Sequence, residues 1–286
     1  MTPPRAGDLL RAALPRSARE RLYELHPGRA RRWRLHPGIE RVPGTGTAVL
    51  TFDDGPDADA TPAVLDELDR AGARATFFML GSRVTESSEL ASEVIQRGHE
   101  VGLHGFDHIR QDRADPARGR EDITRGAAAL EDALGVRCSW YRPPYGKMSD
   151  AAAGACHKLG LTTVYWSAWG LDWEEVGADR IAARVRSQLR DGAIVLLHDS
   201  ARHARRRSAR PTVEAIAPIA ASARELGLAL VSLGDAAGAG TAPFARELPA
   251  TRKQPAAREV PDTREQPTGQ AAPAALEEPD VQGARR

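Results

Sequence analysis

The chain has 286 residues, of which 41% are hydrophobic and 28% are charged, and its formal net charge is +1 at pH 7. These values are typical of a soluble globular protein with one large domain or two small ones, and a net charge so near zero argues against nucleic acid or an acidic polymer as a partner. The two cysteines, Cys138 and Cys156, are too few for a disulfide framework, and no run of about 18 apolar residues predicts a spanning helix.

Residues 1–46 form a basic arm, with ten arginines against four acidic residues. Its leucines predict one or two short amphipathic helices, which Pro15 and Pro27 interrupt. Such an arm can make a peripheral contact with an anionic membrane, or it can be a solvated segment that packs across the domain. The first residues lack the continuous apolar core of a secretory signal peptide, so we expect the protein in the cytoplasm or at the inner membrane face, with export by another route as the alternative.

From residue 47 onward, short apolar segments alternate with amphipathic ones. We expect strands at residues 48–52, 75–80, 99–104, 138–141, 161–167, 193–197 and 228–232. We expect helices at residues 61–71, 87–97, 116–134, 150–159, 178–189 and 212–226. Nearly all-apolar strands between amphipathic helices favour an α/β fold, and their number favours a distorted (β/α) TIM-like barrel of about seven parallel strands. No G-x-G-x-x-G follows the first strand, which argues against a dinucleotide-binding fold.

The helix expected at residues 61–71 has the clearest boundaries. Thr61 can cap its first turn, Pro62 suits the first helical position, and Gly72 closes it. The predicted domain covers residues 47–234. Residues 235–286 are rich in Ala and Pro and show no hydrophobic stripe, so we expect a disordered tail there.

Polar clusters follow five of the expected strands. They are Asp53-Asp54, His104–His108, Arg142–Gly146, Trp169–Trp173 and His198-Asp199. Each one alone has a simpler interpretation, such as an acidic turn or a rigid loop. In a parallel barrel the carboxyl ends of the strands share one rim, so five clusters at matching ends predict an active site.

Two imidazoles and one carboxylate make a three-ligand metal site with room for water and substrate, as catalytic zinc sites do. His104, His108 and either Asp53 or Asp54 can supply that set. The other aspartate can take a proton from a water on the cation, and His198 can protonate a leaving group.

Three further groups can support this chemistry. Asp172 can hold the imidazole of His198 in one tautomer and favour its charged form. Arg142 can pair with the catalytic carboxylate and fix its direction. A backbone N–H near Tyr145 can stabilise an oxyanion. Together these groups predict the metal-assisted hydrolysis of an amide or an ester.

In this order the five motifs resemble those of the polysaccharide deacetylase family, which is carbohydrate esterase family 4, also called the NodB homology domain. The resemblance rests on Thr51–Pro56 and on the four later clusters, with Leu196-Leu197 preceding His198-Asp199, and it covers residues 47–234. It implies a distorted (β/α) barrel. It also implies the removal of acetyl groups from N-acetylated sugars or, in some members, from O-acetylated xylan.

The resemblance also implies a role for each matching residue. Asp53 resembles the catalytic base, and Arg142 resembles the arginine that orients it. Asp172 resembles the partner of the catalytic acid, His198. The metal ligands, usually for zinc and sometimes for cobalt or another divalent ion, are expected to be Asp54, His104 and His108. The substrate-binding positions are expected to be Tyr145, as backbone oxyanion donor, and Trp173 and Leu196, which shape the pocket for the acetyl methyl group.

Two positions depart from the family pattern. Gly105 stands where the second motif usually has Ser or Thr, whose hydroxyl steadies the loop, so a looser loop is expected. Trp169 stands where the fourth motif often begins with Asp, and its ring is expected to alter the cleft near the sugar. Neither change removes a group that the mechanism needs, so an active enzyme is expected.

Five arginines follow the catalytic acid within residues 202–210. They can grip a phosphate or carboxylate on the substrate, or they can form a solvated loop.

The leading hypothesis is a monomeric metal-dependent N-deacetylase that acts on a glycan or glycoconjugate containing an N-acetylhexosamine. An O-acetyl esterase of the xylan type, or an amidase for small molecules, shares the same catalytic groups. A catalytically inactive glycan-binding protein is the third hypothesis, although it has no need for the complete set. The sequence does not identify the sugar.

Overall fold

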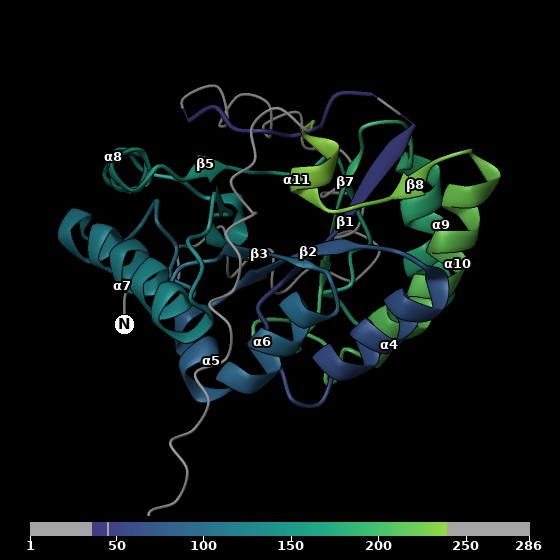
Figure 1. The fold of residues 1–286 in the computed structure, drawn as a ribbon, viewed down its shortest axis with the longest axis horizontal. Coiled ribbons are helices and arrows are strands. Elements are labelled where there is room, and N and C mark those ends of the chain that lie inside the picture. Colours follow the sequence, from purple (N-terminus) through teal and green to yellow (C-terminus); the bar gives the residue numbers. More distant parts are fainter. Residues whose placement is uncertain (1–35, 45, 239–286) are drawn as a thin grey trace, which may run out of the picture. The chain divides into compact units, whose positions relative to one another are not determined.

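The computed structural model describes residues 36–44 and 46–238. Within them, seven parallel strands neighbour one another in the order β5-β4-β3-β2-β1-β7-β6, and β8 pairs with the start of β1. The sheet curls into a half-barrel (Figure 1), which confirms the expected distorted barrel of about seven parallel strands. The strands are β1 (Thr47–Asp53), β2 (Ala75–Met79), β3 (Glu100–Leu103), β4 (Trp140–Tyr141), β5 (Thr162–Thr163), β6 (Ala168–Trp169), β7 (Ile194–His198) and β8 (Ala229–Leu230).

Helices cover the outer face of this sheet (Figure 1). Helix α10 packs against both α4 and α9, and α7 packs against both α5 and α8. The helices are α4 (Thr61–Ala71), α5 (Gly81–Glu86), α6 (Ser88–Gln96), α7 (Pro116–Leu134), α8 (Asp150–Leu159), α9 (Ala178–Gln188), α10 (Arg210–Glu225) and α11 (Leu233–Ala236), with a 3₁₀ turn, η1, at Pro144–Gly146.

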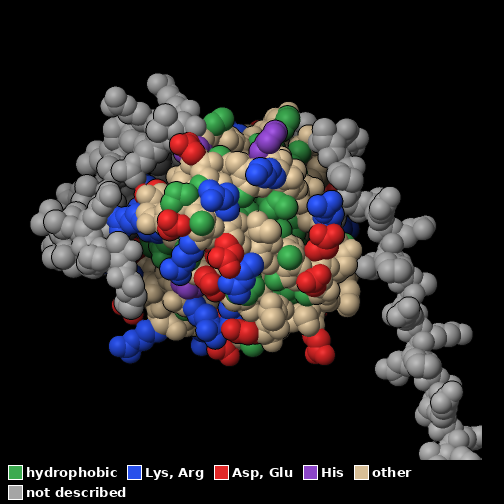
Figure 2. Space-filling model, turned by 90° about the vertical axis from the view of Figure 1, so that its left-hand side faces the viewer, with side chains coloured by type: hydrophobic (Ala, Val, Ile, Leu, Met, Phe, Trp, Pro, Cys, Tyr) green, Lys and Arg blue, Asp and Glu red, His purple; other side chains and the backbone are tan. Residues whose placement is uncertain are grey.

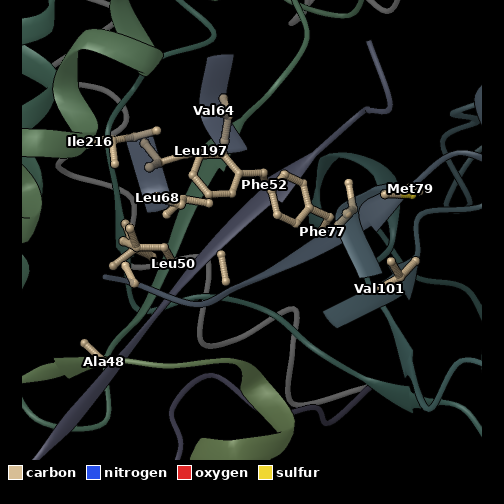
Figure 3. Close-up of a cluster of buried hydrophobic side chains, with 14 of the residues drawn as sticks. Ala48, Leu50, Phe52, Val64, Leu68, Phe77, Met79, Val101, Leu197 and Ile216 are labelled. Carbon is tan, nitrogen blue, oxygen red and sulfur yellow. The ribbon is translucent and has the colours of Figure 1, made fainter. Parts of the chain in front are cut away.

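Successive side chains of β1 point alternately to the hydrophobic core and to the site. Leu50 and Phe52 belong to the hydrophobic cluster between sheet and helices, where Phe52 stacks on Phe77 with ring centroids 5.1 Å apart (Figure 3). Burying each such side chain contributes about 1.5–3 kcal/mol to stability. Val49, one position along, lies in the second cluster, inside the barrel. Because successive strand side chains point to opposite faces, Thr51 and Asp53 follow Val49 toward the barrel interior.

Three helices match their expected bounds, whereas several short elements do not. Helices α4, α7 and α8 have the expected limits, because each carries several turns of periodic apolar residues. The strand expected at 161–167 is only β5, since Val164 forms a single bridge with Ile39 and the chain then continues to β6. The six-residue helix α5, the two-residue strand β6 and the four-residue helix α11 were not expected.

Thr61 is not the N-cap of α4, which is Ala60 without a side-chain cap. The hydroxyl of Thr61 is fully buried and accepts a hydrogen bond from the backbone N–H of Asp57 at 2.8 Å. It donates to Asp199 Oδ2 at 2.5 Å. The Thr61 hydroxyl, which the local sequence predicted as the helix cap, is therefore used in a long-range contact with Asp199 instead.

The described end of the basic arm packs across the domain. Ile39 bridges Val164, Arg41 bridges Ala193, and the Tyr165 hydroxyl donates to the carbonyl oxygen of His36 at 3.0 Å. The short helices expected before residue 36, and the expected disorder from residue 239 onward, lie outside the described residues. At the other end, α11 extends past the expected domain boundary at residue 234.

Charged side chains of both signs are interspersed over the face shown in Figure 2. Surface charges pair in places, since Arg97 Nη1 lies 2.8 Å from Asp66 Oδ1 and 2.9 Å from Asp69 Oδ2. Among the described helices, none has the length and apolar character needed to cross a membrane.

Candidate active site

The expected site residues converge at the carboxyl ends of the strands. The register of β1 and β7 places Asp53 opposite His198. His104 directly follows β3, Arg142 directly follows β4, and the last residues of these two strands, Leu103 and Tyr141, are paired. Four separate segments therefore deliver their polar side chains to one rim of the half-barrel.

Asp54, His104 and His108 form a buried group whose ligand atoms all lie within 4.8 Å of one another. Asp54 Oδ1 lies 3.4 Å from His104 Nε2 and 3.2 Å from His108 Nε2. Ligand atoms about 2.0–2.2 Å from a tetrahedral zinc ion are about 3.3–3.5 Å apart, so the spacing fits such an ion. Both Asp54 (φ 80°) and His108 (φ 54°) adopt left-handed backbone conformations, which are uncommon for residues other than glycine.

Hydrogen bonding around these residues also fits a cation. Asp54 Oδ1 is buried without a hydrogen-bond partner, which a folded protein normally avoids. His104 Nδ1 lies 2.8 Å from the carbonyl oxygen of Arg142, so it carries the proton and leaves the Nε2 lone pair directed at Asp54. Of the expected donors, Asp54 and not Asp53 is the carboxylate shared by both imidazoles.

Electrostatics couple proton and metal binding here. Burial alone would favour a neutral acid, but His108 and His104 hold the pKa of Asp54 well below its usual range. Burial opposes a charged His104, but Asp53 and Asp54 outweigh it and raise the pKa of that imidazole. A metal ligand must be a neutral imidazole, so protonation of His104 competes with cation binding.

Asp53 is held by a buried arginine. Arg142 is fully buried, and its Nη1 donates to Asp53 Oδ1 at 2.8 Å and to Thr51 Oγ1 at 2.6 Å. Its Nη2 donates to the carbonyl oxygen of Tyr165 at 3.0 Å, and its guanidinium lies over the ring of Phe78. The sequence analysis included Thr51 in the first motif but gave its side chain no role, although its position two residues before Asp53, on the same face of β1, was a usable signal.

Asp172 and His198 form a second charged pair. Asp172 Oδ1 lies 3.0 Å from His198 Nδ1, and Oδ2 accepts the backbone N–H of His198 at 2.8 Å. Thr212 Oγ1 donates to the same Oδ2 at 2.8 Å. Burial disfavours a charged imidazole, but Asp172, with smaller contributions from Asp54 and Asp53, raises the pKa of His198 to about 9.

One of the five arginines after His198 faces inward. Arg206 is 6% exposed, and its Nη1 contacts Asp172 Oδ2 at 3.4 Å and hydrogen-bonds Thr212. Its Nη2 donates to the carbonyl oxygens of His198, at 2.9 Å, and Ser200, at 3.1 Å. Neither expectation for this loop therefore describes Arg206, which braces the Asp172–His198 pair, whereas Arg205 and Arg207 are exposed.

Arg206→Leu is expected to lower stability by about 3–5 kcal/mol, because it removes one partner of a buried ion pair and leaves two carbonyls without their donor. The melting temperature, measured by calorimetry, should fall by several degrees. Arg207→Leu is the matched control and should melt within about a degree of the parent protein, because surface changes alter stability by about 0.5 kcal/mol or less. Equal melting temperatures for the two variants would contradict the buried role of Arg206.

The three expected substrate-binding residues border the same rim. Tyr145 is 53% exposed with φ 60°, and its ring centroid lies 4.7 Å from that of His108. Trp173 meets the ring of His198 edge-on, with centroids 5.7 Å apart. Leu196 is buried two residues before His198, on the same face of β7. Trp169 lies in β6, where its ring faces Arg184 and its carbonyl accepts from Gln188 of α9.

The chain is similar to several known carbohydrate deacetylases. The sequence model described as "Polysaccharide deacetylase" matches residues 40–164. The chain is 38% identical over 159 residues to a chitooligosaccharide deacetylase from Bradyrhizobium sp. (strain ANU 289), covering 55% of this chain and 73% of the relative. It is 33% identical over 215 residues to a peptidoglycan-N-acetylglucosamine deacetylase from Bacillus cereus, and the match covers 74% of this chain and 95% of the relative. A family 4 carbohydrate esterase from Streptomyces lividans, solved in complex with acetate, superposes with a TM-score of 0.58 at 30% identity. The superposition covers 65% of this chain and 92% of the esterase.

Proposed function

The chain belongs to the polysaccharide deacetylase family, and from that premise we propose that it is a metal-dependent hydrolase that removes N-acetyl groups from a glycan or glycoconjugate containing N-acetylhexosamine. The observation that carries the proposal is the convergence of three sets of groups on one rim. These sets are the Asp53–Arg142 pair, the Asp54, His104 and His108 group, and the Asp172–His198 pair. A protein that only binds glycans has no need to keep all three.

Asp54, His104 and His108 would hold a divalent cation, most readily zinc because of their two nitrogens and one oxygen, with cobalt as a substitute. When bound, the cation would lower the pKa of a water molecule and polarise the acetyl carbonyl. Asp53 accepts the proton of the attacking water. Arg142 occupies Oδ1 of Asp53, and Oδ2 lies 3.8 Å from His104 Nε2, so Oδ2 is the proton-accepting atom beside the cation site.

His198 protonates the departing amine. Asp172 holds Nδ1, so Nε2 is the atom that donates the proton. A pKa of about 9 keeps the imidazole charged at neutral pH, as a general acid requires. Trp173 and Leu196 border the pocket for the acetyl methyl group, and the backbone N–H of Tyr145 stabilises the negative charge that develops on the carbonyl oxygen.

The names of the relatives support an N-acetylated substrate. One is named for chitooligosaccharides and the other for peptidoglycan N-acetylglucosamine, and both names specify an N-acetylated hexosamine. We therefore place an N-acetylhexosamine in the site ahead of acetylated xylan or a small amide. Separate assays on a free oligosaccharide and on a cell-wall polymer distinguish the two substrate types.

Acetate release from the purified protein tests the function. Chitooligosaccharides, peptidoglycan fragments and acetylated xylan form the panel, and we expect acetate from at least one of the N-acetylated substrates. A chelator should reduce the rate by about 10³-fold, and added Zn²⁺ or Co²⁺ should restore it.

Two variants sharpen this test. After chelation, added zinc should not restore acetate release by Asp54→Ala. It should fully restore acetate release by Asp59→Ala, which removes an exposed acid from the same loop. Release from acetylated xylan alone would favour the esterase. Binding of oligosaccharide without any acetate release would favour the inactive glycan-binding protein.

A further inference from the structure

The loop that carries both imidazole ligands is braced on two sides. Its carbonyl groups are held by the start of α5, where the N–H of Gly81 donates to the carbonyl of Gly105 at 2.9 Å and Ser82 Oγ donates to that of Phe106 at 2.7 Å. Its amide groups face α7 instead. Asp122 Oδ1 accepts the backbone N–H of Asp107, the residue before His108, at 2.8 Å.

Asp122 also fills the space beside Gly105. Gly105 has φ +89°, and a Cβ built on it would lie 2.5 Å from Asp122 Oδ2, closer than atoms can approach. The carboxylate is 4% exposed, and Gln111 Nε2 donates to its Oδ2 at 3.3 Å. A looser loop was expected because Gly105 has no hydroxyl, but a carboxylate from another element occupies that place.

We propose that Asp122 is a positioning residue for the metal centre. It acts through the Asp107 peptide, which sets the direction in which His108 leaves the loop. With that peptide fixed, Nε2 of His104 and Nε2 of His108 converge on Asp54 Oδ1. The proposal rests on the proposed function only in assuming that these three residues bind a divalent cation.

Zinc affinity of the full chain, measured by competition with a chromophoric chelator, tests the proposal. Asp122→Ala should weaken zinc binding about 10–100-fold, the usual effect of removing a group that orients a ligand. Asp122→Asn should stay within about threefold of the parent, because its amide oxygen still accepts from Asp107 and Gln111 can turn its unpartnered Oε1 toward the new NH₂. The visible spectrum of the Co²⁺ form should change in the alanine variant and be retained in the asparagine variant.

Leu130→Ala is the matched control, because Leu130 is fully buried on the same helix, eight residues after Asp122, and its apolar side chain accepts no hydrogen bond from the loop. It should lower the melting temperature and leave zinc affinity unchanged. If Asp122→Ala, like Leu130→Ala, lowers the melting temperature and leaves zinc affinity unchanged, Asp122 is a packing residue and the proposal fails. A parent protein that binds no zinc would overturn the proposed function as well, so the two failures are distinguishable.

Gly105→Ser supplies an independent check. The new Cβ collides with Asp122 and the left-handed backbone disfavours it, so zinc affinity should fall at least tenfold. In Gly105→Ser with Asp122→Ala the collision is gone, so the double variant should bind zinc no more weakly than Gly105→Ser alone. If the fold-loss in zinc affinity of the double variant equals the product of the two single fold-losses, the two positions act independently and the proposal is contradicted.

Discussion

Asp53→Asn is expected to lower kcat by about 10²–10⁴-fold while zinc stays bound, because a carboxamide keeps the shape of the side chain and cannot accept the proton of the attacking water. The amide oxygen can still accept from Arg142, which donates to Oδ1 of the carboxylate at 2.8 Å. Steady-state kinetics together with zinc content, measured by mass spectrometry, separate the two properties.

Stability needs its own measurement in this variant. Arg142 is fully buried, and Asp53 is the carboxylate it pairs with, so the substitution leaves a buried charge without its counter-charge. Losing one partner of such a pair costs about 3–5 kcal/mol, and the retained hydrogen bond should place Asp53→Asn below that range and Asp53→Ala within it. Full activity in Asp53→Asn, with zinc bound, would show that another group is the base.

Asp172→Asn is expected to reduce kcat by about 10²–10³-fold near pH 8 and to move the basic limb of the pH profile downward. Asp172 is the group that contributes most to raising the pKa of His198 to about 9. Without that charge the imidazole titrates nearer its ordinary value of 6.5 and is neutral when it should donate a proton. The defect should therefore be smaller at pH 6 than at pH 9, measured as kcat/KM. A bound cation offsets the contributions of Asp53 and Asp54, but it leaves the sign of the Asp172 effect unchanged.

The same pair makes a pH-dependent contribution to stability. His198 has a folded pKa above its unfolded value, so its contribution is fully present below pH 6.5 and is lost as pH rises through about 9. Burial opposes the charge on Asp172, but His198 and Arg206 lower its pKa, so its contribution is lost only as pH falls below the ordinary value of 3.8. The difference in melting temperature between the chelated parent and Asp172→Asn should shrink between pH 6.5 and pH 10. Asp179→Asn, an exposed acid on α9, should show no such trend, and an unchanged basic limb in Asp172→Asn would contradict the pairing.

Much of the fold could be predicted because its long elements carry their own periodicity. The 19-residue α7 and the seven-residue β1 repeat their apolar pattern often enough to be recognised. Strands β5, β6 and β8 have two residues each, which is too short to display a period, and their place in the sheet depends on neighbouring strands.

The sequence by itself determined the class of the fold and the residue types on its rim, because a parallel β/α unit sends the carboxyl end of every strand to the same edge. Only the tertiary structure decided which atoms meet there. Residue chemistry left Asp53 and Asp54 as alternatives and the family resemblance favoured Asp54; in the structure Asp54 contacts both His104 and His108, and Arg206 turns inward to Asp172. Asp122, on helix α7, occupies the space that is open because Gly105 has no side chain. Local periodicity records which side of a segment is buried, whereas the identity of the distant group that fills a given space depends on how the segments pack.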